Sequence, residues 1–106
     1  MTTFDDRKRQ EESRFKHDQE LAFKARNRGN KLFGLSIAEQ LGLSGDAAES
    51  YAKEVVIADF DAPGDDDIFK KVRADLEAKS IAISDHLLMK HLQDYRQQAA
   101  EQIKSE

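Results

Sequence analysis

Apolar residues recur at helical spacing on both sides of Pro63, the only proline in the chain. From Ala48 to Phe60 they mark a wide face of one helix, which the turn sequence DAPGDDD then ends at Pro63 and Gly64. Further faces of this kind begin at residues 21, 68 and 88. Four helices joined by short connections predict an all-α chain folded as a four-helix bundle.

Each predicted helix has one apolar face that is expected to be buried. These faces are Leu21, Ala25, Leu32, Leu35, Ala38 and Leu41; Ala48, Tyr51, Ala52, Val55, Val56 and Phe60; Ile68, Phe69, Val72 and Leu76; and Leu88, Leu92, Tyr95, Ala99 and Ile103. The chain has only eight aromatic residues. The four on these faces, Phe60 included, are therefore expected in the core rather than in a ligand pocket.

Polar residues mark the predicted helix starts. In the tight corner LGLSGDAAE, either Ser44 or Asp46 caps the second helix, and Glu49 would complete a capping box with Asp46. The carboxylates of residues 65–67 complement the dipole at the start of the third helix. Ser84 is expected to cap the last helix.

The N-terminal segment differs from the rest in having almost no apolar residues. The sixteen residues that follow Phe4 include one strongly apolar side chain, Phe15. The segment is rich in helix formers, yet it offers too little apolar surface to pack deeply against its own chain. We predict a charged helical or partly disordered arm over residues 1–19 and a helical bundle over residues 20–106. The sequence NRGN at residues 27–30 marks a weak place in the first helix.

Charge and composition exclude several classes of function. Residues 1–31 have a net charge of +3, whereas residues 32–106 have a net charge of −7. Acidic residues interleaved with Arg7, Lys8 and Arg9 disfavour nucleic-acid binding. The sequence has no Cys, which excludes disulfides and thiolate sites. Without a long apolar run or a signal peptide, the chain is expected to be cytoplasmic, with no direct membrane insertion.

Two sequences imitate ligand-binding loops, and each lacks an essential residue. GNKLFGLS, at residues 29–36, has the glycine spacing of a phosphate loop, but Leu35 stands where the lysine is required. DFDAPGDDDIFK, at residues 59–70, begins like a calcium loop, but Lys70 replaces the bidentate glutamate. His86 and His91 are five residues apart, about 140° around a helix, and His17 is isolated among charges, so the three histidines are expected at the surface rather than on a metal. With no nucleophile beside a base, we predict a protein that is not an enzyme and has no catalytic residues, metal or cofactor.

Several uncommon blocks occur together in one order: TTFDDR, FKHDQELAFKARNRGNKLFGL, LGLSGDAAESYAKEVVIADF and PGDDD. In these blocks and their order, the chain from Met1 to about Leu76 closely resembles the zeta subunit of the alphaproteobacterial F-type ATP synthase. The resemblance implies a four-helix body and an N-terminal inhibitory segment. In that family the segment enters the catalytic head and blocks rotation in the ATP-hydrolysing direction.

The resemblance also implies which residues contact the partner, namely the catalytic head with its alpha, beta and gamma subunits. The expected partner-binding residues are Phe4, Asp5, Asp6, Arg7, Lys8, Glu12, Phe15 and Lys16. On a helix, Phe4 and Phe15 project within about 20° of each other and form a thin apolar ridge. The protein is then expected to be a monomer when free and peripheral to the inner membrane through the synthase.

The sequence is also compatible with two other functions. One is a small nucleotide-responsive sensor that binds the phosphates of ADP or ATP with Arg26, Arg28 and Lys31. The other is an arm that completes an oligomeric helical interface. Nucleotide titration would test the first, and concentration-dependent size-exclusion behaviour would test the second.

Overall fold

The computed structural model describes the backbone of residues 3–60 and 64–106 and the side chains of residues 17–60 and 64–106. Within these ranges the chain forms helices and no strand. The helices are α1 (Thr3–Gln40), α2 (Gly45–Ala58), α3 (Asp66–Ala78) and α4 (Asp85–Lys104). The prediction of an all-α, four-helix chain with a charged N-terminal helical arm is confirmed.

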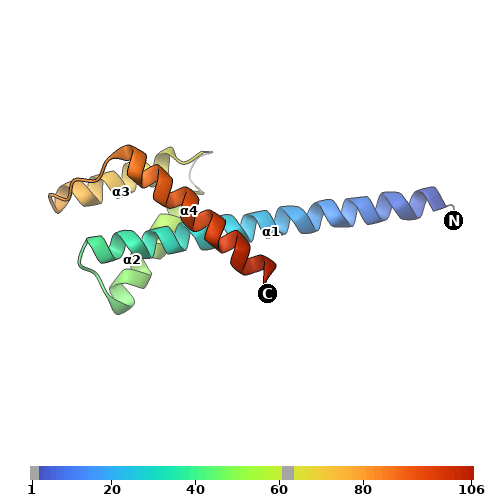
Figure 1. The fold of residues 1–106 in the computed structure, drawn as a ribbon, viewed down its shortest axis with the longest axis horizontal. Helices are drawn as coiled ribbons and strands as arrows, with labels where there is room; N and C mark the ends of the chain where they lie inside the picture. The colour runs from blue at the N-terminus through green and yellow to red at the C-terminus, as the bar shows by residue number, and fades with distance from the viewer. Residues whose placement is uncertain (1–2, 61–63) are drawn as a thin grey trace.

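The first helix is far longer than the others and extends beyond them. Its C-terminal half packs against both α2 and α4, and α3 packs against α2. Figure 1 shows the N-terminal half of α1 projecting away from the other helices, with the N-terminus at the far end. The molecule is accordingly elongated, with extents of 65 × 26 × 21 Å. We call the projecting part the arm and the remainder the body.

One apolar core joins all four helices of the body. Its buried members are Phe33, Ile37 and Ala38 of α1, Tyr51 and Val55 of α2, Ile68, Val72 and Leu76 of α3, and Leu88 and Leu92 of α4. Phe69 and Tyr95 pack against this cluster while remaining partly exposed. The apolar faces predicted for α2, α3 and α4 thus supply most of the core. The expectation for Phe60 is wrong, because its side chain is 58% exposed in the turn after α2.

The buried face of α1 is not the one predicted from leucine spacing. Leu32 and Leu35 are only partly buried, whereas Phe33 and Ile37 are fully enclosed. The physical reason is that α1 lies between two helices, so a single stripe does not describe what it buries. Only Ala38 of the predicted face is fully buried.

Two glycines of α1 sit where neighbouring helices approach most closely. A Cβ atom on Gly29 would lie 2.5 Å from Cα of Arg96 in α4, and one on Gly34 would lie 2.8 Å from Cα of Ala52 in α2. Both separations are shorter than any van der Waals contact, so only glycine fits without a shift. The sequence at residues 27–30 is therefore a helix crossing, and α1 runs through it without a break.

The helix ends follow the predicted turn chemistry in part. Gly42 has a φ of 81°, and the Leu43 amide donates to the Ala38 carbonyl at 2.9 Å, which closes the end of α1. Ser84 accepts a hydrogen bond from the Leu87 amide at 3.2 Å and caps α4 as predicted. Ser44 occupies the N-cap of α2 without a side-chain bond.

The capping box predicted at Asp46 is not the start of α2, which begins one residue earlier, at Gly45. The break predicted after this helix falls at Pro63, which lies outside the described residues. The helix itself ends at Ala58, and Gly64 beyond the break has a φ of 88°, a left-handed conformation suited to glycine.

Candidate protein-binding site

The predicted partner-binding residues all belong to the arm. Phe4 to Lys16 lie within the first turns of α1, whose backbone is helical from Thr3 onward. Their side chains lie outside the described part of the chain, so their contacts with a partner stay a prediction. The structure shows how the body holds this helix and what surface surrounds its base.

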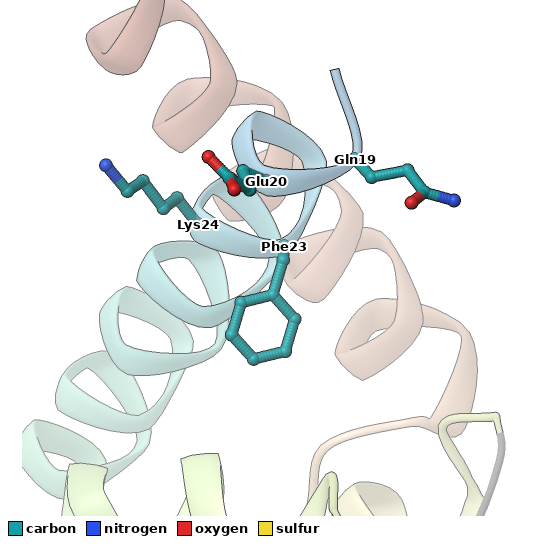
Figure 2. A pocket seen from close by; sticks show the side chains of 4 residues that line it. All are labelled: Gln19, Glu20, Phe23 and Lys24. Carbon is teal, nitrogen blue, oxygen red and sulfur yellow. The ribbon is translucent and has the colours of Figure 1, made fainter. Parts of the chain in front are cut away.

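An aromatic pair marks the place where the arm leaves the body. The rings of Phe23 and Phe60 have centroids 6.1 Å apart and planes inclined by 38°. Both side chains are more than half exposed. Figure 2 shows Phe23 pointing away from α1, with Gln19 and Lys24 directed to opposite sides of the helix. These rings contact each other, yet neither belongs to the core.

A polar cluster lies one turn further along α1 and joins all four helices. Arg26 donates from Nε and Nη2 to both carboxylate oxygens of Asp59, at 2.7 and 2.8 Å. The same Nη2 donates to Asp65 at 3.0 Å. Asp59 follows the last residue of α2, and Asp65 precedes the first residue of α3. Arg26 therefore ties the two ends of the α2–α3 connection to α1.

Asn30 and Arg96 complete this cluster from the other side. Asn30 is fully buried, and its side-chain amide donates to Asp59 at 2.9 Å. Its carbonyl oxygen accepts from Nε of Arg96 at 3.0 Å. Arg96 also donates to both oxygens of Asp65, at 3.1 and 2.8 Å. We call Arg26, Asn30, Asp59, Asp65 and Arg96 the polar clamp, since they hold α1 against α4 and the ends of α2 and α3.

The charges of the clamp are matched, and this matching shifts the pKa of Asp59. Its side chain is only 4% exposed. Hydrogen bonds from Arg26 hold the pKa of Asp59 below its ordinary value. The positive charges of the cluster and the bond from Asn30 lower this pKa further, whereas burial opposes the shift. The bonds to Asp59 likewise raise the pKa of Arg26. Two arginines and two aspartates thus form a neutral cluster at the base of the arm, where a lone buried charge would be costly.

Sequence reasoning did not find the clamp as a unit. In the sequence, Asp59 begins the calcium-like loop and Arg26 is a candidate phosphate ligand, and neither pattern links the two residues. Asp65 belongs to the acidic run predicted to complement the dipole of α3, and its carboxylate makes no capping bond but binds Arg26 and Arg96. The one available signal was Asn30, a polar residue one turn before the buried Phe33 and Gly34.

The cations of the alternative nucleotide site are all engaged in ion pairs. Arg26 binds Asp59 and Asp65, as described above. Arg28 donates to Glu106 at 2.6 Å, and Lys31 lies 3.3 Å from Glu49. The bond from Arg28 lowers the pKa of the Glu106 carboxyl. This pairing gives no support to a phosphate site built from the three cations together, and that function stays an untested alternative.

Other chemistry finds no support in the part of the chain that the structure describes. Within residues 17–60 and 64–106, no three or more His, Asp or Glu side chains gather to hold a metal ion. His17, His86 and His91 are all exposed, as expected for surface residues. None of the described helices combines the length and the apolar character that a membrane span requires.

The fold and the polar clamp define a class of protein: a small all-α protein in which a neutral polar cluster holds the base of a long projecting helix. Comparison with protein families identifies the particular one. The chain belongs to the family described as ATPase inhibitor subunit zeta, whose model matches residues 1–102. Comparison with curated protein sequences gives no significant match.

Membership in this family confirms the resemblance seen in the sequence. It supports an inhibitory role on the ATP synthase and an interaction with that enzyme. It also indicates a regulatory protein. Association with the synthase would locate the chain at the periphery of the membrane that carries it.

Proposed function

We propose that this chain inhibits ATP hydrolysis by the F-type ATP synthase by inserting its arm into the catalytic head. The observation that carries the proposal is that the family match begins at residue 1 and so includes the arm as well as the body. The arm is the part of α1 that projects beyond the other helices (Figure 1). The body is then the anchor, and the arm is the element that contacts the alpha, beta and gamma subunits.

The length and composition of the arm suit insertion between subunits. Residues 3–16 span about 20 Å as a helix, at roughly 1.5 Å per residue. Burying Phe4 and Phe15 in a partner would contribute roughly 4 to 6 kcal/mol. The alternating charges around them would set register and association rate more than affinity. Such an arm gains little by folding on its own body and much by entering a cleft.

The polar clamp explains how a single helix can oppose a rotating enzyme. A helix that blocks rotation must not bend at its base. α1 meets this requirement, because it crosses the body as one continuous helix. Arg26 and Asn30 fasten it to three other elements at that base. Load applied to the arm is therefore transmitted to the packed body.

The direct test adds the purified chain to its cognate synthase and measures hydrolysis and synthesis separately. ATP hydrolysis should fall as the chain is titrated in, while synthesis should be much less affected. If neither rate changes at saturating chain, the proposed function is wrong. If both fall equally, the one-way block of rotation is wrong.

A double variant tests whether the arm residues carry the inhibition. Phe4→Ala with Phe15→Ala removes two rings from the arm, each of which is expected to contribute roughly 2 to 3 kcal/mol in the complex. The concentration for half-maximal inhibition should rise by more than tenfold. The matched control is Leu87→Ala with Met89→Ala, which removes two exposed apolar side chains from α4. Equal effects of the two double variants would contradict the assignment to the arm.

A further inference from the structure

A groove between α1 and α2 remains outside both the core and the arm. It encloses a hollow of about 450 Å³ lined by Asn27, Arg28, Lys31, Lys53, Val56 and Ile57. The Phe23–Phe60 pair lies just beyond it, because Phe60 follows Ile57 by one turn and Phe23 precedes Asn27 by one turn. We call this surface the α1–α2 groove.

The groove and the Phe23–Phe60 pair beside it contain three of the five large exposed apolar side chains of the described residues. Ile57 is 60% exposed, Phe60 58% and Phe23 54%. The other two such residues, Leu87 and Met89, lie on α4. A contiguous apolar surface rimmed by polar groups is typical of a site for another protein. The strip Phe23, Phe60 and Ile57 is long enough to contact about two turns of a helix.

The charged side chains that line the groove are all basic, whereas Glu20 and Lys24 lie together beside Phe23. Arg28, Lys31 and Lys53 line the groove, and no carboxylate lines it among the described residues. Glu106 and Glu49 pair with Arg28 and Lys31 from the rim. Both pairs are exposed, with each side chain at least 36% accessible, and such pairs contribute roughly 0 to 1 kcal/mol. A partner with well-placed carboxylates can therefore replace them, even though the whole chain has a net charge of −4.

We propose that the α1–α2 groove binds an acidic amphipathic helix of the enzyme that the arm inhibits. Apolar residues on one face of that helix would cover Ile57 and the Phe23–Phe60 pair. Carboxylates beside them would pair with Arg28, Lys31 and Lys53. This recognition is the helix-in-groove mode, with charge fixing the orientation.

The position of the groove suits a second contact with the same partner, and in this respect the inference rests on the proposed function. Phe23 lies only two turns beyond Lys16, the last predicted contact of the arm, on the same continuous helix. Once the arm is inserted, the groove is held at the surface of the head. The second contact then forms at a high effective concentration, which raises affinity without being needed for the block itself.

A charge-reversing variant of the full chain tests the groove. Lys53→Glu with Ile57→Ser changes two exposed residues, and the matched control, Leu87→Ser with Lys90→Glu, makes the same exchange on α4. Binding to the purified catalytic head should weaken by tenfold or more in the groove variant and change less than twofold in the control. Thermal unfolding should be unchanged in both. Equal affinity of the two variants overturns the proposal.

Salt dependence and crosslinking sharpen this test. Because charge contributes to recognition, the difference between wild type and groove variant should shrink as salt is raised from 50 to 500 mM. A photocrosslinker in place of Ile57 should attach to an acidic amphipathic helix of the head. Attachment to a basic segment or to a second copy of this chain overturns the proposal. Saturable ATP-induced amide shifts confined to Arg28, Lys31 and Lys53 would assign the groove to a phosphate ligand and also overturn it.

The groove and the arm fail in distinguishable ways. If wild type and groove variant bind and inhibit alike, while Phe4→Ala with Phe15→Ala loses inhibition, the groove proposal is wrong and the proposed function stands. If the wild-type chain neither binds the head nor inhibits hydrolysis, the proposed function is wrong and the groove proposal is overturned with it. The expected result is intact inhibition by the groove variant at a higher concentration.

Discussion

Residues 3–19 and residues 20–40 form a single continuous helix, yet they are stabilised in different ways. The second half contains Phe33, Ile37 and Ala38, all buried between α2 and α4. The first half contains almost no apolar residues besides its two rings, and it projects beyond the body (Figure 1). Packing against α2 and α4 therefore stabilises mainly the second half of α1, whereas helix-forming composition stabilises mainly the first half.

This difference shows that a packed half can support an unpacked one. Starting a helix is costly, whereas adding a residue to an existing helix is nearly neutral for good helix formers. The packed half supplies the costly first turns, and the arm extends them with charged helix-forming residues. An arm built this way keeps its surface available to a partner. The same reasoning predicts that damage to the body propagates to the arm, but not the reverse.

The largest expected effect comes from a charge in the core. Val55 is fully buried in α2, and Val55→Asp would place a carboxylate there without a partner. We expect a loss of several kcal/mol, enough to unfold a domain of this size. Circular dichroism during heating measures it, with Lys53→Asp, an exposed change on the same helix, as control. A melting temperature equal to that of the control would mean that the body does not depend on this core.

The second effect comes from removing the central carboxylate of the polar clamp. Asp59→Ala leaves the buried amide of Asn30 and one face of Arg26 without their acceptor. We expect a loss of about 2 to 3 kcal/mol, less than for a fully buried pair because the Arg26 side chain is 40% exposed. Urea unfolding measures the change, with Asp94→Ala on the exposed face of α4 as control. Equal losses in the two variants would show that the clamp is not stabilising.

The clamp also predicts the direction of a pH dependence. The folded-state pKa of Asp59 is lowered, so its contribution is complete above the unfolded pKa of about 3.9 and is lost as pH falls through the folded value. Wild-type stability should therefore decline below about pH 4, and Asp59→Asn should show a shallower decline. Urea unfolding at several pH values measures both slopes. A steeper acid decline in Asp59→Asn would contradict the role given to Arg26.

A smaller effect on stability is expected from substituting the glycines at the helix crossings. The test is whether the substitution stabilises or destabilises the fold. Helix propensity alone predicts that Gly→Ala in α1 stabilises by up to about 1 kcal/mol. Because a Cβ on Gly29 or Gly34 would meet backbone atoms of α4 or α2, we expect destabilisation by about 1 to 3 kcal/mol instead. The control is Ser50→Ala on the exposed face of α2, which should be neutral or slightly stabilising. Stabilisation by Gly29→Ala would mean that α1 and α4 do not cross closely.

The smallest effect on stability is expected from deleting residues 1–16. This deletion removes a charged segment and two rings but leaves every buried residue of the body. The free energy of unfolding should change by less than about 1 kcal/mol, since a segment with so few apolar residues offers the core little to pack against, while inhibition of ATP hydrolysis is lost. Unfolding of the body would show that the arm belongs to the core, and full inhibition by the truncated chain would place the inhibitory surface elsewhere. The boundary between arm and bundle at residue 19 stays a prediction until such variants are compared.

What the sequence by itself determined is local. Helical periodicity predicted α2, α3 and α4 with most of their buried residues, Ser84 predicted a cap, and the scarcity of apolar residues before Leu21 predicted an arm. The quoted sequence blocks also predicted the family, which the match over residues 1–102 confirms. These features depend on neighbours one or two turns away, so a linear pattern records them.

The tertiary structure alone decided what depends on partners distant in sequence. It buried Phe33 and Ile37 rather than the predicted leucines because α1 lies between two helices. Gly29, which the sequence marks as a weak place in the helix, is instead in close contact with Arg96, 67 positions away in the chain. The tertiary structure also joined Asp59 and Asp65 with Arg26 across 33 and 39 residues of sequence. No periodicity encodes such pairings, because a buried polar group is stable only where the fold supplies its partner.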